Sequence, residues 1–114
     1  MHVTIIELPE YIRKVEKLLD EEERNSLIFY LSTHPKSGVI IQGSGGVRKI
    51  RWARKGRGKS GGVRVIYFFY DKETPLFMLT IFGKNEKDNL NKAERNELAK
   101  LVKILVDTHK RNKS

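Results

Sequence analysis

The hydrophobic pattern of the N-terminal third predicts a short strand followed by two helices. The β-branched run Val3–Ile6 is typical of a strand. Two helical stripes follow, formed by Ile12, Val15, Leu18 and Leu19 and then by Leu27, Ile28 and Leu31. Asp20 and Glu23 have the spacing of a capping box at the start of the second helix. Pro35 should end that helix near Thr33–His34, because it disfavours helical geometry in the residue before it.

In the middle of the chain the pattern changes to that of three strands. Val47–Arg54 alternates between apolar and basic residues, whereas Val63–Tyr70 is apolar on both faces, as in a central strand. Leu76–Phe82 is the third strong strand. The connectors, Gly56–Gly62 and Asp71–Pro75, have hairpin length. The three strands are therefore predicted to form an antiparallel meander.

The C-terminal part predicts one helix. Asn91 and Glu94 have capping-box spacing, and the apolar stripe consists of Leu98, Leu101, Val102 and Leu105. The basic tail His109–Ser114 is expected to fray. The predicted class is α+β in a single domain, residues 1–114. An antiparallel sheet, made of the short N-terminal strand and the meander, packs against an N-terminal helical hairpin and the C-terminal helix.

Length and composition fit one small folded domain. Of the 114 residues, 39% are hydrophobic and 32% charged, which is too apolar for a disordered chain. The longest apolar run, Val65–Tyr70, is much shorter than a membrane-spanning helix. Met1–Leu8 lacks the features of a secretory leader, and the absence of cysteine excludes disulfide and thiolate chemistry. We therefore expect a cytoplasmic protein with no membrane partner.

The positive charge is concentrated in the middle of the chain. The net charge is −4 over residues 1–23, +10 over residues 24–70, which contain no acid, and +3 over residues 71–114. Eight basic residues fall between positions 48 and 64: Arg48, Lys49, Arg51, Arg54, Lys55, Arg57, Lys59 and Arg64. Such a cluster attracts polyanions, because binding a phosphate backbone releases counterions. Nucleic acid is the favoured partner; a generic basic surface or a patch for an acidic protein segment is the alternative.

Familiar nucleotide and metal motifs are matched only superficially. Gly56–Gly61 has the form G-x-G-x-x-G, but a strand follows it where the dinucleotide motif needs a helix. Gly58–Ser60 is similar to the end of a P-loop, yet Ala53 occupies the position of the first required glycine. The three histidines, His2, His34 and His109, are scattered, so no metal site is predicted.

An enzyme built on this cluster would work mainly with arginine and lysine. RNA can supply its own 2′-hydroxyl as nucleophile, so the protein must position it and stabilise the developing charge. Arg51 or Arg64 suits the second task, because guanidinium groups bind phosphate oxygens through a planar fork. Lys49 or Lys55, crowded by other cations, is a candidate for proton transfer. Such a site is a weak catalyst unless something else positions the RNA.

Two segments resemble the RelE/HigB toxins of bacterial type II toxin–antitoxin modules. The first is Gln42–Tyr67, QGSGGVRKIRWARKGRGKSGGVRVIY, and the second is Leu79–Glu86, LTIFGKNE, followed by a capped helix. The similarity is closest to the HigB-like branch of the RelE/ParE superfamily and spans about residues 10–106. It implies the compact α+β fold of that family.

The resemblance also implies a ribosome-dependent mRNA endoribonuclease (an mRNA interferase) that uses neither metal nor cofactor. Such toxins enter the ribosomal A site, beside 16S rRNA, and inhibit translation by cutting mRNA to cyclic-phosphate and 5′-hydroxyl ends. Position by position, the implied catalytic residues are Lys49, Arg51, Lys55, Arg64 and Lys84, and the implied RNA-binding residues are Arg48, Arg54, Arg57 and Lys59. The implied partner is a cognate antitoxin that usually carries a DNA-binding domain.

Departures from RelE proper fit the HigB-like branch. Asn85 stands where RelE has an arginine, and Leu90–Asn91 lies where RelE has a tyrosine. Two other functions stay open: a ParE-like toxin that inhibits DNA gyrase, and an RNA-binding module without chemistry. The basic loop and Arg64 favour the nuclease over the first. The second would need exposed aromatics that stack on bases, but the hydrophobic pattern places Trp52, Tyr67, Phe68 and Phe69 in the core.

Overall fold

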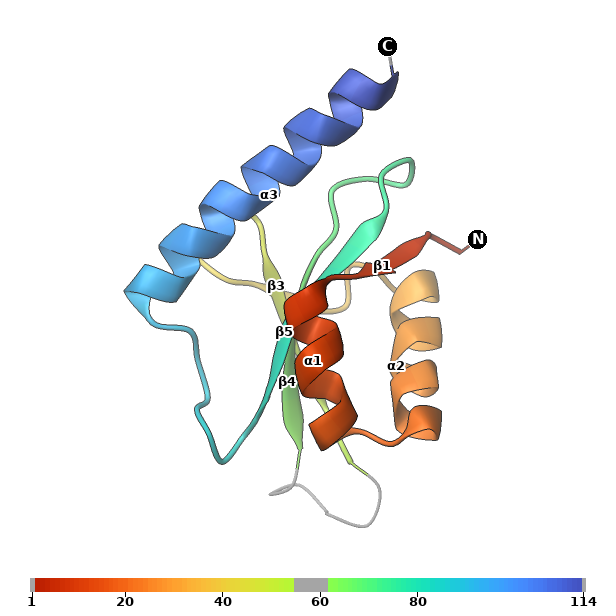
Figure 1. Ribbon diagram of the computed structural model, residues 1–114, viewed down its shortest axis with the longest axis vertical. Coiled ribbons are helices and arrows are strands. Elements are labelled where there is room, and N and C mark those ends of the chain that lie inside the picture. The colour runs from red at the N-terminus through yellow and green to blue at the C-terminus, as the bar shows by residue number, and fades with distance from the viewer. Residues whose placement is uncertain (1, 55–61, 114) are drawn as a thin grey trace.

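The computed structural model describes residues 2–54 and 62–113 and has an α+β fold, as predicted (Figure 1). Its elements are β1 (Ile5–Glu7), α1 (Pro9–Leu18), α2 (Glu21–Thr33), β2 (Val39–Ile40), β3 (Arg48–Trp52), β4 (Val63–Phe68), β5 (Leu76–Gly83) and α3 (Lys92–Lys113). All five strands belong to one sheet with the order β1-β5-β4-β3-β2. The predicted meander is therefore its centre.

The edges of the sheet differ from the prediction. β1 pairs with β5 in parallel, so the sheet is mixed rather than antiparallel throughout. Backbone bonds from Leu8 to Met78 and from Leu76 to Thr4 extend this pairing. The two-residue strand β2 is an addition that the pattern did not predict; it pairs with β3 at the opposite edge. Local patterns do not encode the direction or partner of an edge strand, because long-range contacts decide both.

The helix starts follow the capping residues. At the start of α2, the Asp20 carboxylate accepts from the Glu23 amide at 2.7 Å, and the Glu23 carboxylate accepts from the Asp20 amide at 2.9 Å. This reciprocal pair is the predicted capping box. The prediction that the tail frays from His109 is wrong, because α3 continues through Lys113. There Lys110 lies over the Tyr70 ring, 5.5 Å from its centroid.

Hydrophobic cores lie on both faces of the sheet. On one face, residues of α1 and α2 pack against alternate residues of β4 and β5; members of this core are Tyr11, Val15, Leu27, Leu31, Val65, Tyr67 and Met78. On the other face, residues of α3 pack against the intervening strand residues; members of this core are Ile66, Phe68, Leu79, Phe82, Leu90 and Val102. β4 is buried along its whole length, as expected of a central strand. Any charged side chain on it must therefore have a specific partner.

The four aromatic residues assigned to the core pack as predicted. Tyr67, Phe68 and Phe69 are buried, and Trp52 packs partly buried against the core beneath α2, with its ring 5.4 Å from that of Tyr30. In the part of the chain that the structure describes, no helix is both long enough and apolar enough to span a bilayer.

Candidate functional site: a cationic cluster with a carboxylate in it

Three basic side chains, Lys49, Arg51 and Arg64, lie on one face of the sheet, and we call them the cationic cluster. Lys49 and Arg51 are two residues apart in β3, so both point to the same face. Arg51 is the cross-strand partner of Arg64 in β4. Lys49 is paired with Ile66, which belongs to the core beneath α3, so the cluster shares that face. Like charges opposite each other destabilise a sheet, so stability does not explain this pairing.

Arg64 is buried and held by one carboxylate. Its Nε and Nη2 atoms lie 2.9 Å and 2.7 Å from the same oxygen, Oδ1 of Asp88. The Arg64 side chain is 6% exposed, whereas that of Asp88 is 53% exposed. The ion pair therefore has a buried cation and an anion that faces water. The side of the pair that meets solvent is thus the carboxylate and not the guanidinium.

Asp88 is a charged group at neutral pH. The Arg64 guanidinium, through its hydrogen bond, holds the pKa of the Asp88 carboxyl below its usual range, and the charges of Arg64, Lys49 and Arg51 lower it further. All three cations of the cluster thus act on this one carboxylate. The oxygens of Asp88 therefore occupy a position that suits an oxyanion bound by the cationic cluster. Carboxylate and phosphate oxygens accept the same hydrogen bonds from guanidinium groups.

Lys49 also contacts the loop that carries Asp88, between β5 and α3. Its Nζ donates to the side-chain oxygen of Asn89 and lies 3.4 Å from the backbone oxygen of Asp88. Two members of the cationic cluster, one on β3 and one on β4, therefore bind consecutive residues of the loop between β5 and α3. This loop forms one wall of the candidate site.

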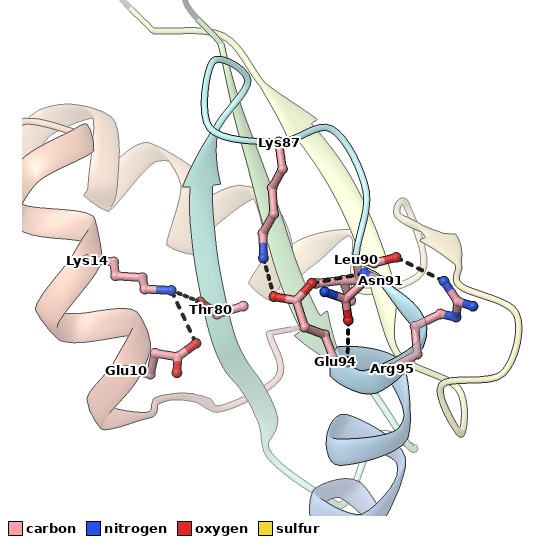
Figure 2. A network of polar contacts seen from close by, with 8 residues as sticks. All are labelled: Glu10, Lys14, Thr80, Lys87, Leu90, Asn91, Glu94 and Arg95. Carbon is pink, nitrogen blue, oxygen red and sulfur yellow. Dashed lines mark hydrogen bonds and ion pairs between the residues drawn. The ribbon is translucent and has the colours of Figure 1, made fainter.

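The loop between β5 and α3 is fixed by the first turn of α3 (Figure 2). Lys87 forms an ion pair with Glu94, and Asn91 forms a capping box with Glu94 through contacts of 2.8 Å and 2.9 Å. The hydrogen bond from Lys87 holds the pKa of the Glu94 carboxyl below its usual range, and the bond from the Asn91 amide adds to this. Lys87 Nζ also lies 5.0 Å from the centroid of the Phe82 ring. These contacts hold the loop that carries Asp88 and Asn89 against the sheet.

A comparison with protein-family models gives a match that includes all residues of this site. The model of the RelE toxin of the RelE/RelB toxin–antitoxin system matches residues 24–113, well over half of the chain. The chain belongs to the RelE toxin family. It is therefore a toxin of a toxin–antitoxin module, and membership implies a cognate antitoxin as partner. Toxins of the RelE family are generally endoribonucleases. The matched region includes every strand and loop residue of the site just described.

Of the six other site residues expected for this RelE-family toxin, the structure describes three: Arg48, Arg54 and Lys84. Lys84 is exposed directly after β5, and its amide donates to the Gly62 carbonyl, beside the start of β4. Arg48 and Arg54 are not brought to the cationic cluster. Arg48 alternates with the β3 members of the cluster and so points to the opposite face, and Arg54 lies two residues after the end of β3, near the end of α1. Lys55, Arg57 and Lys59 fall outside the described residues.

Arg48 and Arg54 have backbone partners on that other side of the sheet. Nη1 of Arg48 donates to the carbonyls of Lys36 and Gly38, at 3.1 Å and 2.8 Å. Nη1 of Arg54 lies 3.4 Å from the Leu18 carbonyl at the end of α1. These bonds connect β3 to the segment before β2 and to the helical hairpin. They give both arginines a structural role, and their RNA-binding role stays a prediction.

Asp88 and Asn89 are the site residues that the sequence analysis missed. Both lie outside residues 24–70, the basic stretch that holds every expected site residue except Lys84. A usable signal was nevertheless present. Arg64 lies in a strand that is otherwise apolar, and buried charges in proteins are paired. Because residues 24–70 contain no acid, the partner of Arg64 had to come from the acids of residues 1–23 or of residues 71–114. No group of three His, Asp or Glu side chains suited to a metal occurs within residues 2–54 and 62–113.

Proposed function

We propose that this RelE-family toxin is a ribosome-dependent endoribonuclease that cuts translated mRNA in the A site. The observation that supports the proposal best is the Arg64–Asp88 pair within the cationic cluster. A buried guanidinium is paired with a half-exposed carboxylate, whose oxygen occupies a position that suits an anionic oxygen of RNA. Two more cations, Lys49 and Arg51, lie on the same face. This is a site for stabilising negative charge that develops on a phosphate.

The proposed reaction uses the 2′-hydroxyl of the RNA. Its oxygen attacks the adjacent phosphorus, the bond from phosphorus to the 5′-oxygen breaks, and the products are a 2′,3′-cyclic phosphate and a 5′-hydroxyl. Arg64, with Arg51, stabilises the charge on the non-bridging oxygens through its fixed donors. Lys49, Lys55 and Lys84 are the proposed groups for moving the proton from the 2′-oxygen to the leaving oxygen. The reaction as proposed needs no metal or cofactor.

We propose dependence on the ribosome because the described residues of this site have no evident means of orienting the RNA strand. The cationic cluster can hold a phosphate, but a flexible RNA strand rarely places its 2′-oxygen in line with the leaving oxygen. The ribosome holds the A-site codon in one conformation, and so supplies the orientation. We infer that the toxin acts in the bacterial cytoplasm and that it belongs to the HigB-like branch. Asn85 and Leu90–Asn91 support that branch assignment.

Induced expression provides a test that separates the nuclease from a gyrase inhibitor. The intact toxin should arrest growth and inhibit a purified translation system, without affecting supercoiling by gyrase. Arg64→Ala should relieve both effects, whereas Arg13→Ala, which removes an exposed arginine of α1, should relieve neither. Circular dichroism of both variants controls for folding. Inhibition of gyrase by a folded toxin that leaves translation intact would overturn the proposal.

A further inference from the structure

A polar cavity of about 510 Å³ lies beside the cationic cluster. It is open to solvent and lined by the connection from β2 to β3, the loop before α3 and the first two turns of α3. The lining residues used below are Gln42, Asn89, Leu90, Lys92, Arg95 and Asn96. We call this cavity the amide pocket. Its volume is in the range typical of sites that hold a small molecule or one group of a larger ligand.

One side chain links the amide pocket to the cationic cluster. Asn89 lines the pocket, and its side-chain oxygen accepts from Nζ of Lys49. The preceding residue, Asp88, is the partner of Arg64. A ligand whose phosphate replaces the Asp88 carboxylate at Arg64 therefore has the amide pocket as its immediate neighbour.

The side chains of the pocket suit a flat group with both donors and acceptors at its edge. Gln42 and Asn96 are exposed, and each amide offers two N–H donors and one acceptor oxygen. Arg95 is half-buried and fixed, because its Nη1 donates to the Leu90 carbonyl at 2.9 Å (Figure 2). A guanidinium plane held in this way can stack on a base or donate to its acceptors. Buried Leu90 adds an apolar surface to the lining of the pocket.

The backbone of the connection from β2 to β3 also approaches this guanidinium. Gly43 has a φ of +78°, and a Cβ atom at this position would lie 3.8 Å from Nε of Arg95. Lys92 is exposed and lines the same pocket, so it adds positive charge that attracts a sugar–phosphate chain. Amide side chains, a fixed guanidinium and peripheral cations together are the groups that proteins use to read unpaired bases of single-stranded RNA.

We propose that the amide pocket holds one unstacked nucleobase of the RNA, next to the phosphate that is cut, and reads it through Gln42 and Asn96. This inference rests on the proposed nuclease function and deepens it. It assigns to the toxin itself part of the sequence preference of cleavage. The cationic cluster provides the chemistry and discriminates little between bases, because its groups contact phosphate.

The test measures base preference rather than total activity. A library of messages with a randomised A-site codon is cut by the intact toxin on ribosomes, and the 5′ ends are sequenced. Gln42→Ala and Asn96→Ala should each reduce the preference at one nucleotide beside the cut by about fivefold, the effect of losing one neutral hydrogen bond. Asn25→Ala, which removes an exposed amide from α2, should leave the preference unchanged. Unchanged preferences in both pocket variants would overturn the proposal.

A second readout keeps this inference separate from the nuclease proposal. The four nucleoside monophosphates are titrated into the free toxin, and the side-chain NH₂ signals of Gln42 and Asn96 are followed by NMR. Gln42 is the sole glutamine in the sequence, so one substitution assigns its signal. If the toxin cuts no RNA, the nuclease proposal fails, and the titration alone decides on the pocket. Shifts of both signals support a nucleobase site, and the absence of shifts with all four nucleotides rejects it.

Discussion

In its ion pair with Arg64, the Asp88 carboxylate occupies the position proposed for an RNA phosphate, so it should compete with RNA for Arg64. If an RNA phosphate takes the position of the carboxylate, Asp88→Asn should strengthen RNA binding, because the phosphate then displaces a neutral group. Both contacts of Arg64 are made to one carboxylate oxygen, and the Asp88 side chain is 53% exposed, so water and salt weaken the pair. A partly exposed pair of this kind corresponds to a gain of roughly two- to fivefold in affinity.

A matched control separates competition at the site from a general change in charge. Asp107→Asn also raises the net charge of +9 by one, and the Asp107 side chain is likewise 53% exposed, paired with Lys103 at 3.0 Å on α3. Binding is measured by fluorescence anisotropy with a 2′-O-methyl RNA, which cannot be cut because its nucleophile is blocked. We expect the gain for Asp88→Asn to exceed that for the control. Equal gains would refute the competition, and weaker binding would show that Asp88 positions Arg64 for the RNA.

Three further predictions concern charge stabilisation, the loop before α3 and the packing of β4. Arg64→Lys keeps the charge but loses the fork, so single-turnover cleavage on ribosomes should fall roughly 100-fold, and a loss below about tenfold would contradict the assigned role. Glu94→Gln removes the ion pair with Lys87 and should lower the unfolding free energy by about 0.5 kcal/mol at pH 7. Because the pKa of Glu94 in the folded state lies below its ordinary value of 4.5, this stabilisation is present above pH 4.5, and denaturant titrations should show it disappearing as the pH falls further. Gly38→Ala would place a Cβ atom 2.7 Å from the Tyr67 hydroxyl and should cost about 1–3 kcal/mol, so an unchanged melting temperature would count against the packing described.

The central elements of the fold could be predicted because their local signals agree with their environment. β4 is apolar on both faces and is buried on both faces. The capping boxes at Asp20 and Asn91 mark helix starts that the structure confirms. The parallel pairing of β1 with β5 could not be predicted, because a three-residue strand carries no signal for its partner. The two-residue strand β2 is similarly too short for a periodic pattern.

The candidate site could be predicted only in part, because some of its residues are brought together by long-range contacts. Alternation along β3 correctly places Lys49 and Arg51 on one face and Ile50 and Trp52 on the other, since a strand has a period of two. The meander then brings Arg64 opposite Arg51. Asp88 and Asn89 enter through a loop whose path depends on contacts with Glu94 and the sheet, and a local pattern does not record that path. The amide pocket combines segments more than 40 residues apart, so only the folded chain assembles it.

The central claim is that Arg64 belongs to a site that cuts mRNA on the ribosome. The most direct test maps 5′ ends of a message in a purified translation system with the intact toxin, with Arg64→Ala and without ribosomes. We predict cuts in phase with the codons, ending in 5′-hydroxyl groups, that require both ribosomes and Arg64. Cuts that persist with folded Arg64→Ala, or the absence of cuts with the folded intact toxin, would contradict the account.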